Sequence, residues 1–280
     1  MRGKTCIITG ATAGIGLEAA TRLGALGARL ILVGRDSRKG EAALAKLRTR
    51  VPGVAAEMHY ADLSRRTEIR RLALELLRAS PRIDVLLNNA GAYFVERSTT
   101  EDGLEQTFAL NHMGYFLLTH LLRDRIAASA PARIVNVASE AHRRTTSLDF
   151  GDLQTVRRYS GWKAYQRSKL CNILFTRELA RRLAGSGVTA NCLHPGFVAS
   201  SFGDNNKGLF RVGIGVLKLV RGITVEQGAE TPVYVATAPE LATTSGRYFD
   251  RCRERAPSEA GRNDEAASRL WRESERFAGL

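Results

Sequence analysis

Residues 159–169 read YSGWKAYQRSK and contain one spacing of tyrosine and lysine twice. Tyr159 lies four residues before Lys163, and Tyr165 lies four residues before Lys169. On a helix, two residues at this spacing lie one turn apart, about 6 Å along the axis, so an ammonium group can sit beside a phenol. A free tyrosine titrates near roughly pH 10, and a neighbouring cation lowers its pKa. Either pair could therefore supply a tyrosine that exchanges protons near neutral pH.

A helical projection distinguishes the two pairs. Gly161 lies between Tyr159 and Lys163, so we expect Tyr159 to precede the regular helix, where its spacing to the lysine loses its meaning. The face through Tyr165 continues with small or polar residues suited to lying against a cofactor, namely Ser168, Lys169, Asn172, Thr176 and Ala180. The face through Lys163 is expected to meet mostly solvent and continues with Arg167, Leu174, Arg177 and Arg181. We therefore predict that Tyr165 and Lys169 are the working pair.

The elements that position this pair follow from a regular alternation of patterns. Short runs rich in valine, isoleucine and leucine predict strands at residues 5–9, 29–33, 54–60, 83–87, 133–138, 188–194 and 246–249. Amphipathic patterns predict helices near residues 15–27, 38–50, 65–79, 101–127, 162–184, 224–238 and 257–277. Alternation of this kind predicts an α/β fold with a doubly wound parallel sheet of about seven strands and helices on both faces. No linker or repeat interrupts it, so we expect a single domain over residues 1–280.

The first predicted strand runs directly into the glycine-rich stretch TGATAGIG. Gly10, Gly14 and Gly16 thus lie between a strand and a helix, where glycine permits a tight turn and lets the backbone approach a pyrophosphate. Because the stretch opens a strand–helix–strand unit of the right size, we predict dinucleotide binding on a Rossmann-type fold.

The residues after the second strand bear on the choice of dinucleotide. The sequence there is VGRDSRKG, and Gly34 leaves no carboxylate to bind the ribose hydroxyls of NAD. Arg35, with Lys39 one turn further on, offers cations to a 2′-phosphate, which favours NADP(H) over NAD(H). The alternative interpretations are an ordinary surface arginine at Arg35 and a helix N-cap at Asp36.

The spacing TGxxxGxG resembles that of the short-chain dehydrogenase/reductase family, and the resemblance covers essentially the whole chain. Further family marks follow in order, namely Asp62-Leu63, the NNAG of residues 88–91, Asn111, Ser139, the YxxxK of Tyr165 and Lys169, and the HPG of residues 194–196. The branch most similar to this chain is that of the retinol dehydrogenases, on the stretches AYQRSKLCNILFTRELARRL, NHMGYFLLTHLL and the tail from Tyr248 through Trp271.

This resemblance implies roles for the residues of a catalytic site. Tyr165 would exchange a proton with the carbonyl oxygen, while Lys169 would lower its pKa and hold the nicotinamide ribose. Ser139 would bind the substrate oxygen, with a strand-end cap as the alternative, and Asn111 would support a water leading protons to Lys169, with an ordinary polar helix residue as the alternative. Glu140 is unusual beside the serine and could alter substrate choice.

The resemblance also implies a set of cofactor-binding residues. Two positions depart from common family usage, because Ala13 replaces a basic residue found in many NADP-dependent members and Ser200 replaces a threonine. The implied residues are Gly10, Thr12, Gly14, Ile15, Gly16, Arg35, Lys39, Asp62, Leu63, Asn89, Ala90, Gly91, Tyr165, Lys169, Pro195, Gly196, Val198 and Ser200.

Two stretches without a clear period, residues 139–160 and 195–223, follow the carboxyl ends of strands, where open parallel sheets bind ligands. Residues 197–223 combine apolar side chains with glycines. We expect them to form a lid over an apolar alcohol or carbonyl substrate that excludes water from hydride transfer. An oligomer contact or ordinary core packing is the alternative.

Composition and charge argue against several other classes of protein. The formal net charge is +14, but 35 of the 42 basic residues are arginines dispersed along the chain, and no nucleic-acid-binding motif accompanies them. The cysteines and histidines match no metal-binding spacing, so we expect no metal. No apolar run approaches the roughly 20 residues of a membrane span, and the start does not resemble a signal peptide. We therefore expect no transmembrane segment and a cytoplasmic location.

Two rival functions remain. The first is a non-catalytic NADP-binding regulator, which conflicts with the complete Asn, Ser, Tyr and Lys set. The second is a serine hydrolase using Ser139, His142 and Asp149, which lacks a GxSxG turn and leaves the glycine loop without a purpose. The family resemblance suggests a homodimer or homotetramer, with a monomer as the alternative.

Overall fold

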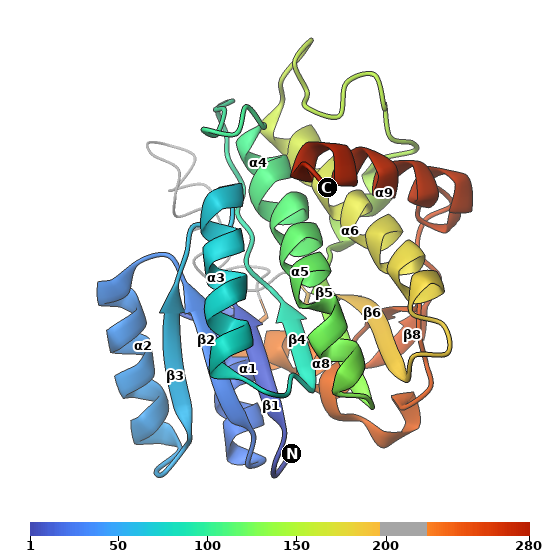
Figure 1. Ribbon diagram of the computed structural model, residues 1–280. Coiled ribbons are helices and arrows are strands. Elements are labelled where there is room, and N and C mark those ends of the chain that lie inside the picture. Colours follow the sequence, from blue (N-terminus) through green and yellow to red (C-terminus); the bar gives the residue numbers. More distant parts are fainter. Residues whose placement is uncertain (197–222) are drawn as a thin grey trace.

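A single, mostly parallel sheet runs through the protein, and helices cover both of its faces (Figure 1). The computed structural model describes residues 1–196 and 223–280. The sheet has the order β3-β2-β1-β4-β5-β6-β7-β8. Its strands are β1 (Thr5–Thr9), β2 (Arg29–Gly34), β3 (Ala56–Tyr60), β4 (Val85–Asn88), β5 (Ala132–Val137), β6 (Val188–His194), β7 (Tyr248–Asp250) and β8 (Arg253–Arg255).

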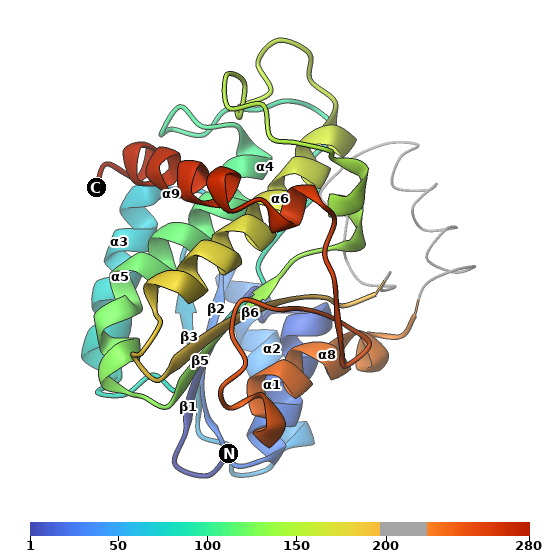
Figure 2. The same cartoon turned by 90° about the vertical axis from the view of Figure 1, so that its right-hand side faces the viewer.

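The helices form two layers, one on each face of the sheet. One layer contains α1 (Gly14–Ala25), α2 (Ser37–Arg50) and α8 (Val225–Thr237). The other contains α3 (Arg66–Ala79), α5 (Gly114–Ala128) and α6 (Gly161–Arg182), and α9 (Asp264–Ala278) packs on α6 (Figure 2). The short helix α4 (Gln106–Phe108) leads through a π-helical turn, Ala109–Met113, into α5.

Strand β1 shows why the apolar runs become central strands. All five of its residues are buried. Ile7 contributes to the core beneath α3, α5 and α6, whereas its neighbour Ile8 contributes to the core beneath α1 and α8. Since alternate side chains of a strand point to opposite faces, a strand covered on both sides must be apolar throughout. The predicted doubly wound α/β fold is confirmed.

The sheet also contains a strand that the sequence did not predict. The seven expected strands are all present and parallel, and β8 adds an eighth that runs antiparallel to β7. Arg251 and Cys252 form the tight connection between them and have positive φ angles of 49° and 58°. The sequence of β8 is RER and all three residues are exposed, so it carries no apolar alternation from which a strand could be predicted.

Two predicted helices begin later than expected. The predicted helix 101–127 starts at Gln106, because the side chain of Glu105 accepts hydrogen bonds from the backbone of Thr107 and Phe108 and caps the first turn. The predicted helix 257–277 starts at Asp264, since Asn263 accepts from the backbone of Ala266. In both cases a side-chain cap sets the start of the helix.

Further expectations concern membrane spans, metals and the lid. Among the helices that the structure describes, none is long and apolar enough to cross a membrane. Residues 1–196 and 223–280 contain no cluster of three or more histidine, cysteine or acidic side chains that could hold a metal ion. The predicted lid lies outside the described residues except for Ile223, and so do Val198 and Ser200.

Candidate active site

A cavity of about 550 Å³ opens at the carboxyl ends of the central strands. It is the kind of crevice in which open parallel sheets bind ligands. The predicted residues that line it are Gly10, Thr12, Gly14, Ile15, Gly16, Arg35, Lys39, Asp62, Leu63, Asn89, Ala90, Gly91, Ser139, Tyr165, Lys169, Pro195 and Gly196. The fold therefore brings together, around one cavity, segments that follow β1, β2, β3, β4, β5 and β6.

Glycine is required in the loop after β1 because other chain segments approach its backbone closely. A Cβ atom at Gly10, where φ is +66°, would lie 2.8 Å from the Cα of Ala90. A Cβ atom at Gly16 would collide with the carbonyl of Gly10. Asn89 ties the two loops together, because its Nδ2 donates to the carbonyls of Thr9 and Gly10. The result is an open backbone cradle at the N-terminus of α1, which fits a pyrophosphate.

Arg35 and Lys39 lie at the end of the cavity beyond β2. The side chain of Arg35 is 67% exposed and its guanidinium lies 3.7 Å from the Asp62 carboxylate. Asp36 is the N-cap of α2, because its carboxylate accepts from the backbone of Lys39 at 2.9 Å. Gly34 has a packing role as well, since a Cβ atom there would collide with Thr12. Two cations thus remain available to a ligand phosphate.

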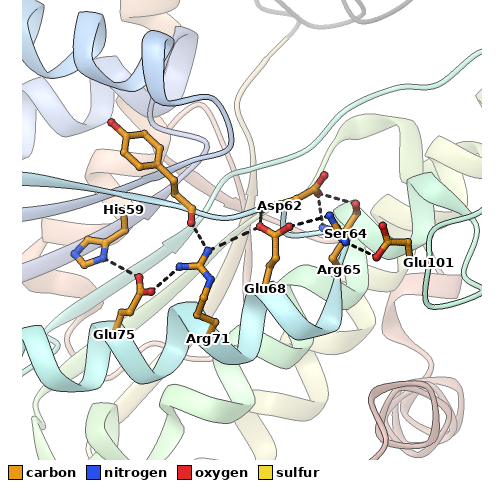
Figure 3. Close-up of polar contacts among 9 residues, drawn as sticks. His59, Asp62, Ser64, Arg65, Glu68, Arg71, Glu75 and Glu101 are labelled. Carbon is orange, nitrogen blue, oxygen red and sulfur yellow. Dashed lines mark hydrogen bonds and ion pairs between the residues drawn. The ribbon is translucent and has the colours of Figure 1, made fainter.

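Asp62 is held by a chain of polar contacts along α3, shown in Figure 3. One carboxylate oxygen of Asp62 accepts from the backbone and hydroxyl of Ser64, at 3.0 and 2.7 Å. Its backbone N–H donates to Glu68 at 2.8 Å. The polar contacts continue from Glu68 through Arg71 to Glu75. These contacts leave the other oxygen of Asp62 directed toward Arg35, so the loop after β3 presents a fixed carboxylate to the cavity.

The two candidate tyrosines occupy different surroundings. Tyr159 precedes α6, as predicted, and its hydroxyl donates to the carbonyl of Phe94 at 3.0 Å. It is absent from the residues that line the cavity, whereas Tyr165 and Lys169 both line it. Gly161 permits this arrangement, because a Cβ atom there would collide with the Phe94 carbonyl.

Burial is the main influence on the pKa values of Tyr165 and Lys169. The Lys169 ammonium donates to the carbonyl of Val137 at 3.1 Å and lies 5.6 Å from the centre of the Tyr165 ring. Burial raises the pKa of Tyr165 to about 12, although a hydrogen bond with Ser139 acts in the opposite direction. Burial also lowers the pKa of Lys169 to about 7. Desolvation is thus the largest influence on the pKa of both groups, and the expected lowering of the Tyr165 pKa by Lys169 stays a prediction.

The polar face of α6 serves two purposes rather than one. Tyr165 and Lys169 line the cavity, but Asn172 donates to Val137 and Thr176 accepts from Asn136, both on β5. The expectation that this whole face lies against a cofactor is therefore wrong beyond Lys169. The opposite face also differs from its prediction, because Leu174 is fully buried in the core.

Asn111 lies in the π-helical turn before α5 and is fully buried. Its side chain accepts from the backbone N–H of Ala92 and donates to the carbonyl of Ala92, each at 2.9 Å, and also donates to Ser168 at 3.0 Å. The side chain thus joins the loop after β4 to α6. It is not among the residues that line the cavity, and its support of a proton-carrying water stays a prediction.

Ser139 caps the short helical turn that follows β5, since its hydroxyl accepts from the backbone of Ala141 at 3.2 Å. Ser139 therefore both caps this turn and lines the cavity. Glu140 does not line the cavity: its carboxylate accepts from the Tyr248 hydroxyl at 3.1 Å and pairs with Arg143 at 2.6 Å. Its place beside the serine therefore ties the turn to β7.

The geometry contradicts a hydrolase triad. The Nδ1 atom of His142 lies 2.7 Å from the carbonyl of Ser139, not from its hydroxyl. The other ring nitrogen accepts from the backbone of Ser258 at 3.0 Å. Asp149 accepts from the backbone of Gly151. Because both nitrogens of His142 are engaged with the backbone, it cannot act as a base for Ser139.

Several lining residues were not predicted. Trp162, Phe94 and Leu110 border the tyrosine side of the cavity, together with His194, whose pKa is lowered by burial. Two of them had a usable signal, because Trp162 precedes Tyr165 by three residues and so shares its side of the helix, and His194 opens the HPG motif. Phe94 and Leu110 come from a loop and a π-helical turn with no periodicity to indicate their direction.

Comparisons with known proteins agree with this geometry. The family model for short chain dehydrogenases matches residues 4–208. Human retinol dehydrogenase 13 is 41% identical over 99% of this chain and 85% of its own length, and human retinol dehydrogenase 14 is 40% identical over 100% and 88%. Among solved structures, an uncharacterized protein from Mycobacterium paratuberculosis aligns over 100% of this chain and 94% of its own, with 32% identity and a TM-score of 0.80. A short chain dehydrogenase from Burkholderia cenocepacia in complex with NADP shares the fold, with a TM-score of 0.70, 24% identity and coverage of 89% and 96%.

The glycine cradle, the cavity and the sequence matches together define a member of the short chain dehydrogenase family. The chain belongs to its retinol dehydrogenase-like branch. It is accordingly an oxidoreductase of alcohols and carbonyl compounds that uses a nicotinamide dinucleotide.

Proposed function

We propose that this enzyme uses NADP(H) to interconvert an apolar alcohol and its carbonyl compound, with Tyr165 as the proton donor or acceptor. The observation that carries the proposal is the separation of charge along the cavity. Arg35 and Lys39 follow β2, whereas Ser139 follows β5, and β1 and β4 lie between these strands in the sheet. Exposed cations thus lie at one end, and the buried Tyr165 and Lys169, with apolar neighbours, lie at the other.

The basic end supports a preference for the phosphorylated dinucleotide. Gly34 leaves the end of β2 without a carboxylate, and the Asp62 carboxylate is engaged with Ser64 and faces Arg35. An exposed guanidinium that can form charged, two-pronged hydrogen bonds is suited to a 2′-phosphate. When bound, the dinucleotide would supply the hydride, and Arg35 and Lys39 would hold its phosphate.

At the other end, the residues of the chain control the proton. Tyr165 keeps its proton through the neutral range because burial raises its pKa to about 12. A protonated phenol within reach of a substrate oxygen can donate as charge develops there, and the Ser139 hydroxyl can bind the same oxygen. Lys169, fixed by Val137, holds its ammonium beside the phenol ring.

Apolar side chains around the tyrosine favour a substrate without charge. Ala92, Phe94, Leu110 and Trp162 line the cavity there. A charged keto acid or a sugar would lose hydration against these apolar side chains. The relatives named retinol dehydrogenase agree with an apolar substrate of this class.

The test is steady-state oxidation of NADPH with a panel of aldehydes, keto acids and sugars, repeated with NADH. We expect turnover with apolar aldehydes and a preference for NADPH. Binding of NADPH without turnover of any carbonyl compound would instead support the rival regulatory function. Turnover confined to charged substrates would contradict the apolar assignment.

A further inference from the structure

Trp162 occupies a defined place in the first turn of α6. The helix begins at Gly161, whose backbone packs against the carbonyl of Phe94. Trp162 follows immediately and precedes Tyr165 by three residues, so the two side chains lie on the same side of the helix. The start of α6 therefore fixes the indole beside the phenol that we propose to be catalytic.

The indole is part of a compact aromatic group. Its ring stacks on that of Tyr165, with centroids 5.8 Å apart and an angle of 16° between the planes. The buried ring of Tyr93 packs edge-on against both, at 6.3 Å from Trp162 and 6.1 Å from Tyr165. These spacings lie within the range of favourable aromatic pairs. Trp162 and Tyr93 together are called the aromatic wall below.

Although it is stacked in this way, Trp162 is 49% exposed. It lines the same cavity as Ser139 and Lys169. The second tryptophan of the chain, Trp271, is only 2% exposed and packs against Phe175. A large aromatic surface left open within a cavity, next to a polar reaction centre, is typical of a ligand-binding surface.

We propose that Trp162 determines substrate specificity by binding the apolar chain of the alcohol or carbonyl compound, with Tyr93 holding the indole in place. This inference rests on the proposed function and adds to it the residue that selects for chain length. The stacked indole offers a rigid apolar face next to the phenol, so a substrate whose oxygen meets Tyr165 and Ser139 extends its chain along Trp162. Each methylene group removed from water in this way is worth about fourfold in binding.

The first experiment compares Trp162→Ala and Trp162→Phe with the wild type, using decanal and butanal as substrates and NADPH as cofactor. The measured quantity is the ratio of kcat/KM for decanal to that for butanal. We expect Trp162→Ala to lower this ratio about tenfold or more, and Trp162→Phe to retain most of it. If Trp162 only orients Tyr165, its loss would lower kcat/KM for both substrates by the same factor. An unchanged ratio in Trp162→Ala therefore overturns the proposal.

The matched control is Val156→Ala. Val156 is 66% exposed but is not among the residues that line the cavity. Its substitution removes exposed apolar surface without touching the aromatic wall, so the decanal to butanal ratio should stay at the wild-type value. An equal loss of the ratio in Val156→Ala and Trp162→Ala would contradict a specific role for Trp162.

A second measurement does not depend on turnover. The chain has two tryptophans, so Trp271→Phe leaves Trp162 as the single emitter and Trp162→Phe leaves Trp271. With NADPH saturating, titration with 1-decanol should shift the emission of Trp162 to shorter wavelength and leave that of Trp271 unchanged. Calorimetric binding of 1-decanol without any change in Trp162 emission overturns the proposal.

The outcomes also separate this inference from the proposed function. A wild-type enzyme that prefers decanal, with a Trp162→Ala variant that keeps the same preference, refutes the role of Trp162 and leaves the proposed function standing. A wild-type enzyme that turns over only charged substrates refutes both.

Discussion

The two ends of the cavity are built in different ways. At the basic end, Arg35 and Lys39 are exposed side chains beside a backbone cradle formed by Gly10 and Gly16. At the tyrosine end, Tyr165 and Lys169 are buried and their pKa values are displaced by burial. Exposed charges act through water and are screened by salt, whereas buried groups act through desolvation. Recognition of the dinucleotide should therefore depend on ionic strength, while chemistry at the tyrosine should depend on packing.

The largest expected effect is a loss of kcat when the tyrosine end alone is altered. Tyr165→Phe removes the transferable proton and should lower kcat by at least about 100-fold, while the Kd for NADPH measured by fluorescence stays near the wild-type value. Tyr159→Phe is the matched control and should stay active, because Tyr159 does not line the cavity and its hydroxyl donates to the Phe94 backbone carbonyl. Loss of activity in Tyr159→Phe with an active Tyr165→Phe would show that the wrong tyrosine has been chosen.

The next effect concerns the stability cost of burying Lys169. Its pKa is about 7 in the folded protein and 10.5 ordinarily, so between these values the unfolded chain binds more protons and stability rises with pH. Lys169→Met should therefore be more stable than the wild type near pH 6.5, by at most about 5 kcal/mol. This difference should shrink as the pH rises toward 9.5, as measured by urea unfolding across that range. A difference independent of pH would show that Lys169 is not desolvated in the folded state.

Arg35→Ala tests the basic end. A charged hydrogen bond to a phosphate contributes roughly 1.5 to 3 kcal/mol, so the KM for NADPH should rise about 10-fold to 100-fold, with little change for NADH. Added salt should weaken NADPH binding in the wild type more than in Arg35→Ala, because the exposed guanidinium is screened. Equal effects of the substitution on both dinucleotides would refute the assignment of Arg35 to the 2′-phosphate.

The smallest effect is expected at Glu140, which follows Ser139 but does not line the cavity. Glu140→Gln weakens its contacts with Tyr248 and Arg143 and should lower the free energy of unfolding by about 1 kcal/mol. Because Glu140 is not among the cavity-lining residues, the ranking of substrates should stay the same. A changed ranking would revive the expectation that this residue alters substrate choice.

Patterns confined to single segments predicted the fold well. The seven parallel strands, the glycine loop after β1 and the position of Tyr159 ahead of α6 all follow from apolar runs and glycine spacing that neighbouring residues determine. The start of α4 did not follow, since it depends on a cap by Glu105, a residue type less common at this position than serine or aspartate. The strand β8 depends on pairing with β7 rather than on its own sequence.

The motif residues around the cavity could be named from the sequence, but Phe94 and Leu110 could not. The energetics of the site were not predictable either, because the pKa of Tyr165 depends on burial by segments far from it in the sequence. The contacts of Asn111 were not predictable either, because its amide is engaged by the backbone of Ala92 and by Ser168, which lie in other segments. The role proposed for Trp162 required the structure, because spacing alone does not show that the residue stacks on Tyr165 and still stays 49% exposed.

The most direct test of the central claim is the ratio of kcat/KM for decanal with NADPH to that with NADH, measured on the wild-type enzyme at one ionic strength. It requires both ends of the cavity to work in a single turnover. We expect turnover of decanal and a preference for NADPH of about tenfold or more, from the charged hydrogen bonds at Arg35. No turnover of decanal with either dinucleotide, or a preference for NADH, would contradict the central claim.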